Sequence, residues 1–92
     1  MTNYSALGEY TAYAQQARDA AGRRFALMHN LANDLSRQAD QIETVVNPDK
    51  IKAVIDDIAA ADREMRAALE RANQSAALCN KPALSIHSLS KF

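Results

Sequence analysis

The sequence predicts an all-α fold, an antiparallel hairpin of two long helices in a single domain that spans residues 1–92. Two observations support this prediction. The two prolines among the 92 residues, Pro48 and Pro82, divide a chain that otherwise consists largely of good helix formers, including 19 alanines. Within both long segments, apolar residues recur at steps of three and four, the spacing of one face of a helix.

The first helix is predicted over residues 5–46. Ser5 is a suitable N-cap, and Glu9 places an acidic side chain near the positive end of the helix dipole. Because the apolar stripe continues to Val46, we expect the helix to reach that residue. The stripe consists of Ala14, Ala17, Ala21, Phe25, Met28, Ala32, Leu35, Ala39, Ile42 and Val46.

The second helix is predicted over residues 48–80. Its start is well marked, because Asn47 is a good N-cap, Pro48 suits the first helical position and Asp49 falls in the first turn. Its end is expected just before Pro82, which restricts the residue that precedes it. The stripe of this helix consists of Ile51, Val54, Ile55, Ile58, Ala61, Met65, Ala68, Leu69, Ala72, Ala76 and Cys79.

A short connection at Pro48 would make the two helices antiparallel neighbours. The alternative is one kinked helix that continues through the proline, but the capping residues around it favour the hairpin. A tight turn there places Ile42 opposite Ile55 and Phe25 opposite Ala72. In this register the first helix extends beyond the second at its N-terminal end.

The apolar face is wider than the contact between two helices requires. Leu27, Leu31 and Val45 lie beside the first stripe and widen it. We therefore expect a coiled-coil-like four-helix bundle, formed by a homodimer or by docking on another protein; the sequence does not decide between them. The candidates for helix packing or for a dimer interface are Phe25, Leu27, Met28, Leu31, Leu35, Ile58, Met65 and Leu69.

The C-terminal tail, residues 81–92, is expected to be docked, either on its own chain against the tyrosines at the N-terminal end of the first helix or on a partner. The same residues are also candidates for binding a partner protein, because aromatic side chains are enriched in interfaces. The alternation Leu84-Ser85-Ile86 would further suit addition of a strand to a partner's sheet. These protein-binding candidates are Tyr4, Leu7, Tyr10, Tyr13, Leu84, Ile86, Leu89 and Phe92.

Catalytic and metal-binding patterns are missing from the sequence. His29, His87 and Cys79 have no ligand spacing among them, and Cys79 lies on an apolar stripe as a small hydrophobic residue. Gly8 and Gly22 are isolated, so there is no glycine-rich phosphate loop. We expect no enzyme, no cofactor, no metal and no small-molecule substrate.

A nucleic-acid partner is the alternative that the first helix leaves open. Arg18, Arg23 and Arg24 lie among amide side chains, and a dimeric helical hairpin with such a surface resembles, in architecture, the plasmid copy-number protein Rop, which binds paired RNA loops. However, the 11 basic residues are balanced by 11 acidic ones, whereas nucleic-acid binders present a basic stripe.

Membrane association is not expected, because no apolar run is long enough to span a bilayer and no helix combines an apolar face with a basic one. The N-terminus also lacks the pattern of a signal peptide. We therefore expect a small, cytoplasmic, non-enzymatic accessory or regulatory protein that modulates or inhibits a larger host protein by binding it. Phages and mobile elements use proteins of this type.

Overall fold

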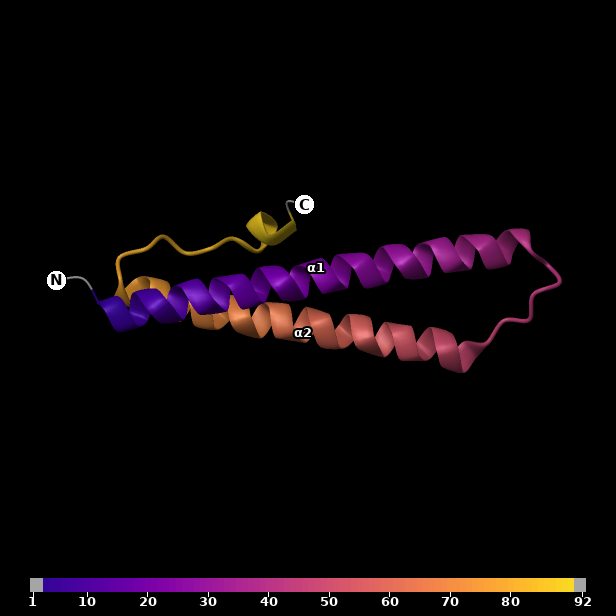
Figure 1. Ribbon diagram of the computed structural model, residues 1–92, viewed down its shortest axis with the longest axis horizontal. Helices are drawn as coiled ribbons and strands as arrows, with labels where there is room; N and C mark the ends of the chain where they lie inside the picture. Colours follow the sequence, from indigo (N-terminus) through magenta and orange to yellow (C-terminus); the bar gives the residue numbers. More distant parts are fainter. Residues whose placement is uncertain (1–2, 91–92) are drawn as a thin grey trace.

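The computed structural model describes residues 3–90 and shows two long helices packed side by side, α1 (Tyr4–Asp40) and α2 (Pro48–Leu78), followed by a short 3-10 helix, η1 (Ile86–Ser90) (Figure 1). The described residues contain no strand. The predicted all-α hairpin is therefore confirmed, and the kinked single helix is wrong.

Both ends of α1 differ from the prediction. Asn3, rather than Ser5, is the N-cap, and its side-chain oxygen accepts a hydrogen bond from the Ala6 amide at 3.0 Å. The helix ends at Asp40, well short of the predicted Val46. Four of the five residues 42–46 are β-branched, namely Ile42, Thr44, Val45 and Val46. Such residues lose side-chain freedom in a helix. The apolar spacing of this segment therefore did not make it helical, and residues 41–47 form the loop.

Asn47 caps α2 as predicted, accepting a hydrogen bond from the Lys50 amide at 3.2 Å. At the other end, α2 stops at Leu78, and Asn80 adopts the left-handed conformation with φ of 58°. The Lys81 amide then donates to the Ala76 carbonyl at 3.0 Å, closing the helix end. This turn sends the tail back along the hairpin (Figure 1).

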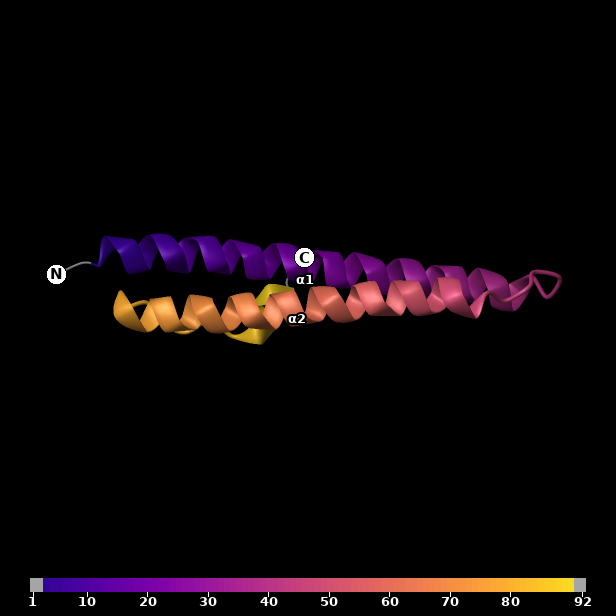
Figure 2. The same cartoon turned by 90° about the horizontal axis from the view of Figure 1, so that it is seen from below.

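The register between the helices also differs from the prediction, because the turn is centred on the loop rather than on Pro48. Ser75 donates a hydrogen bond to Glu9 at 3.3 Å, and Arg24 pairs with Asp62 at 3.0 Å. The predicted opposition of Phe25 with Ala72 is therefore wrong. The two helices end close together at the N-terminal end of α1, and α1 extends beyond α2 at the loop instead (Figures 1 and 2).

The core occupies only the half of the hairpin that is remote from the loop. We call residues 3–21 and 61–90 the proximal half and residues 22–60 the distal half. Alanines make up most of the proximal core, and Leu89 of the tail lies against them with 2% of its surface exposed. The buried apolar residues among those described are Ala6, Ala14, Ala17, Ala20, Ala21, Ala61, Met65, Ala68, Ala72, Ala76 and Leu89.

The tail forms a third layer over the proximal half. Figures 1 and 2 together show it running back from the end of α2 over the helix pair, on the side away from the viewer in Figure 2. Leu84 is fixed by Asn73, which accepts from the Leu84 amide at 2.7 Å and donates to the Leu84 carbonyl at 3.1 Å. The described part of the tail consists of an extended segment, residues 81–85, followed by η1.

Candidate protein-binding surface

The distal half presents large apolar side chains but buries none of its residues. Residues 22–60 are all described, and every one of them is at least partly exposed. Phe25 is 48% exposed and Ile42 is 93% exposed, although apolar side chains of this size are normally buried in a core. The exposed large apolar residues of this half are Phe25, Met28, Leu35, Ile42, Val45, Val46 and Ile55.

This exposed surface continues the face that the tail covers in the proximal half. Ala21 lies in the core cluster with Leu89, and Met28 and Leu35 follow it at intervals of seven residues on the same stripe of α1. On α2, Ile55 is two such intervals before Leu69, which packs against the same cluster. We call Phe25, Met28, Leu35 and Ile55 the distal face.

The two helices separate toward the loop, and an open cleft lies between them there. Figure 1 shows the ribbons close together in the proximal half and apart near the loop. Leu31, Ile51 and Val54 supply apolar walls of the cleft, and Arg37 and Lys50 supply polar ones. Alanine allows helices to approach closely, whereas the larger side chains of the distal half hold them apart.

A hollow, which we call the junction hollow, marks the boundary between the tail and the distal face. Phe25 of the distal face lines it together with Ile86 and Leu89 of the tail. Arg24 and Arg66 add positive charge at the same place. The remaining lining residues are Ala21, Met65 and His87. The apolar floor is therefore shared by α1, α2 and the tail.

The two arginines of this hollow are held by one carboxylate. Asp62 accepts hydrogen bonds from Arg66 Nε and from Arg24 Nε, each at 3.0 Å. The hydrogen bond from Arg66 is the main reason why the pKa of Asp62 lies below its ordinary value of 3.8, and the positive charges of both arginines act in the same direction. Partial desolvation opposes the shift without reversing it.

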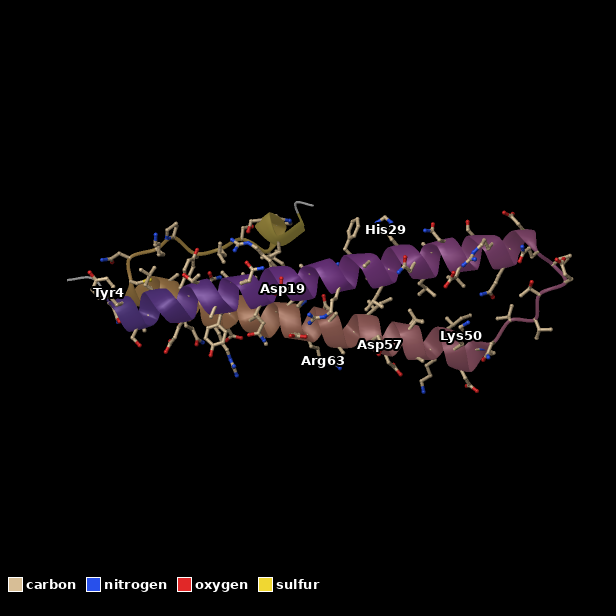
Figure 3. All side chains as sticks on the ribbon, in the orientation of Figure 1. Tyr4, Asp19, His29, Lys50, Asp57 and Arg63 are labelled. Carbon is tan, nitrogen blue, oxygen red and sulfur yellow. The ribbon has the colours of Figure 1, made fainter. Side chains whose placement is uncertain are left out.

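An aromatic pair extends the distal face beyond the tail. The rings of Phe25 and His29 lie with their centroids 4.2 Å apart. Figure 3 shows His29 projecting from α1 on the side on which the tail lies. Phe25 lines the junction hollow beside η1, and His29 lies one turn further along α1.

The tyrosines predicted to receive the tail are only partly used. Tyr4 is 79% exposed, so it is not covered by the tail. Tyr10 and Tyr13 are half-buried, as is Leu7, and the guanidinium of Arg71 lies 5.6 Å from the centre of the Tyr13 ring. The structure thus gives Tyr13 a cation–π contact within the hairpin.

The tail residues predicted to bind dock on their own chain. Leu89 is buried and Ile86 packs beside it. Leu84 is half-buried, and its backbone is hydrogen-bonded to the side chain of Asn73. Leu89 and Ile86 contact the alanine core, because the turn at Asn80 carries the tail toward the middle of the hairpin (Figure 1). Phe92 lies outside the described residues.

The candidates for helix packing or dimerisation divide into three groups. Met65 is buried and Leu69 packs against the core, so both hold the monomer together. Leu27, Leu31 and Ile58 are half-buried between the helices. The remaining candidates, Phe25, Met28 and Leu35, are exposed and belong to the distal face.

The arginines of the nucleic-acid alternative are partly committed to contacts within the chain. Arg23 pairs with Glu64 and Arg24 pairs with Asp62, which joins α1 to α2 at the boundary of the two halves. Arg18 is exposed on α1. A phosphate ligand would compete with both carboxylates for these arginines.

The described residues contain no group of three or more His, Cys, Asp or Glu side chains that could hold a metal ion. Cys79, at the end of α2, is a free and half-buried thiol. Within residues 3–90, no helix is both long and apolar enough to cross a bilayer.

Sequence reasoning missed the residues that fix the tail and those that form the tip of the loop. Asn73, which fixes the tail through Leu84, directly follows Ala72 of the apolar stripe. A polar residue beside the stripe was the one feature of the sequence that could have indicated a hydrogen bond there. Ile42 and Val46 were assigned to a buried stripe but lie exposed in the loop. Ile55, assigned in the same way, is half exposed.

Comparison with known proteins adds no relative to this description. No protein-family model, no curated protein and no solved structure matches the chain.

Proposed function

We propose that this chain is a small, non-enzymatic accessory protein of the cytoplasm that modulates a larger protein by binding it through the distal face. One observation carries the proposal. The distal half leaves its large apolar side chains exposed, although the tail covers the continuation of the same face in the proximal half. Exposed apolar patches of this kind mark sites of protein interaction. The exposed rings and aliphatic side chains supply the apolar contacts on which interface centres depend.

The experiment is capture of partners on the immobilised protein, compared with a variant of the distal face. Met28→Asp places a charge in the middle of the face, where it would be desolvated in a complex. Leu78→Asp is the matched control, because Leu78 is 66% exposed but lies at the opposite end of the hairpin. The expected result is a protein retained by the native chain and by Leu78→Asp but lost with Met28→Asp.

Two outcomes contradict the proposal. The first is retention of the same protein by Met28→Asp and by the native chain alike, which would show that the protein binds outside the distal face. The second is capture of structured RNA in place of a protein, lost when Arg18 is replaced by Ala and strongly weakened by salt. That outcome would favour the alternative of an RNA-binding hairpin. Circular dichroism on each variant checks that the helices are retained.

A further inference from the structure

The distal face, the junction hollow and the loop complement one another. We propose that a second copy of this chain covers the distal face, with the two distal halves packed antiparallel so that the loop of each copy fills the junction hollow of the other. The inference rests on the proposed function in one respect, because it assigns an occupant to the same face. The complex is a four-helix bundle over the distal halves, flanked at each end by a proximal half with its own tail.

The apolar surfaces match in position. The loop carries Ile42, Val45 and Val46 as exposed apolar side chains, and the hollow offers Phe25, Ile86 and Leu89 as an apolar floor. The loop follows Asp40, whereas the hollow is lined by Ala21 and Phe25, so the two lie at opposite ends of the distal face. An antiparallel arrangement of two copies brings each loop to the partner's hollow, and both contacts form at once by symmetry.

The charges match in the same arrangement. Asp40 and Glu43 make the loop end of α1 acidic, while Arg24 and Arg66 lie at the hollow. Asp62 neutralises part of this positive charge, so two arginines face one carboxylate there. An acidic loop therefore approaches a hollow with one positive charge in excess, which favours this orientation.

The distal face runs along the helices over most of the distal half. The distal part of α1 is about 28 Å long at 1.5 Å per residue. The open cleft between the distal helices adds area, because side chains of the partner can enter it.

The tail limits where the second copy can bind. Leu89 and Ile86 occupy the equivalent face of the proximal half, so a partner helix cannot continue past the hollow without displacing them. The tail therefore fixes the register of the complex at half a hairpin of overlap. A larger protein that binds the distal face has to compete with the second copy.

The first measurement is sedimentation equilibrium between about 1 and 200 µM, the range in which a modest interface dissociates. We expect a monomer–dimer equilibrium for the native chain. Met28→Asp and Ile55→Asp should each raise the dissociation constant about thirtyfold or more, since each charge lies at the centre of the interface. Leu78→Asp should leave the dissociation constant unchanged. A native chain that stays monomeric throughout overturns the inference, and so does a dimer that neither face variant weakens.

The second measurement tests the orientation of the two copies. A spin label is attached at Thr44→Cys in a Cys79→Ala background, and the distance between the two labels is measured by pulsed electron resonance. The antiparallel overlap places the labels about 30 Å apart along the bundle. A parallel pair of hairpins would hold them within about 15 Å, the spacing of packed helices plus their side chains. The shorter distance overturns the inference.

The two proposals fail separately. A monomeric native chain that still captures a protein through Met28 leaves the proposed function in place and removes the second copy as occupant. A dimer broken by Met28→Asp, with capture that Met28→Asp does not alter, leaves the second copy in place and contradicts the proposed function.

Discussion

The two halves of the hairpin are built from the same two helices, yet only the proximal half has a core. Its buried residues are nearly all alanines, among the smallest side chains, together with Met65, Ser75 and Leu89. The distal half has the larger apolar side chains, including Phe25, Leu35 and Ile55, and buries none of them. Large side chains alone do not form a core, because two helices can enclose only a narrow stripe.

The difference comes from the third layer. Leu89 fills the space above the alanines, and the close approach of the helices beneath it leaves no room for larger residues. Toward the loop the helices stand apart (Figure 1), and no segment of the described chain covers the distal face. The tail therefore completes the core of the proximal half, whereas the distal half leaves its large apolar side chains exposed.

The largest expected effect on the free energy of unfolding comes from removing Leu89, the main contact between the tail and the proximal half. Leu89→Ala should reduce the free energy of unfolding by about 3 kcal/mol, since it deletes a fully buried leucine and leaves a cavity. Leu35→Ala, its counterpart on the distal face, should cost less than about 1 kcal/mol, because the side chain is already 43% exposed. Urea denaturation followed by circular dichroism at low protein concentration measures both. Equal losses would mean that the halves do not differ.

A smaller effect is expected from releasing the tail at its other attachment. Asn73→Ala removes both hydrogen bonds to Leu84 and should cost about 1–2 kcal/mol, because the two backbone groups lose their partner in a partly buried place. Hydrogen exchange should then show loss of protection in residues 84–90 while the distal helices stay unchanged. Gln74→Ala is the control, since Gln74 is exposed beside it. Unchanged exchange in the tail would show that Leu89 alone holds it.

A gain of stability is expected from a substitution in the helix of the proximal half. Gly8 lies inside α1, and a Cβ added there meets nothing within 4 Å. Gly8→Ala should therefore stabilise the protein by about 0.5–1 kcal/mol through the helix propensity of alanine. The reverse change at the exposed Ala12 in the next turn, Ala12→Gly, should cost about the same. Thermal denaturation of both variants tests the pair, and a loss on Gly8→Ala would contradict it.

The smallest effect concerns the ion pairs at the boundary of the halves. The pKa of Asp62 is lowered in the folded protein, mainly by the hydrogen bond from Arg66, so the unfolded chain takes up a proton first as the pH falls. Its contribution to stability is present above the ordinary value of 3.8 and is lost as the pH falls through the lower folded value. Native protein and Asp62→Asn should therefore differ in melting temperature at pH 7 and converge in acid. A constant difference would contradict the role of this carboxylate.

The sequence predicted the class of fold and the start of α2 because both depend on local signals. Asn47 and Pro48 act within one turn of helix, and the alanine-rich segments favour helix wherever they lie. The end of α1 was predicted wrongly because Ile42 and Val46 continue the apolar spacing, while their β-branched neighbours favour a loop. Apolar spacing takes account only of position, and not of the lower helix propensity of β-branched side chains.

The surface was harder to predict than the fold, since it depends on contacts between distant segments. An error of a few residues in the loop shifted the register along the whole hairpin, so residues such as Phe25 received the wrong partners. Burial of Ala21 depends on Leu89, which comes near the other end of the chain. Nothing within either segment indicates this contact, whereas the width of the apolar face correctly indicated that two helices could not cover it.

The length of the hairpin also determines how the protein moves through solution. The radius of gyration is 17.8 Å, and the molecule measures 66 × 22 × 14 Å along its principal axes. A compact chain of this length would have a radius of gyration of about 12 Å. The rod therefore diffuses more slowly than a sphere of the same mass, and a monomer elutes early from a sizing column, as though it were a larger protein. The antiparallel association that we propose would make the rod longer still, so the frictional ratio would rise together with the mass.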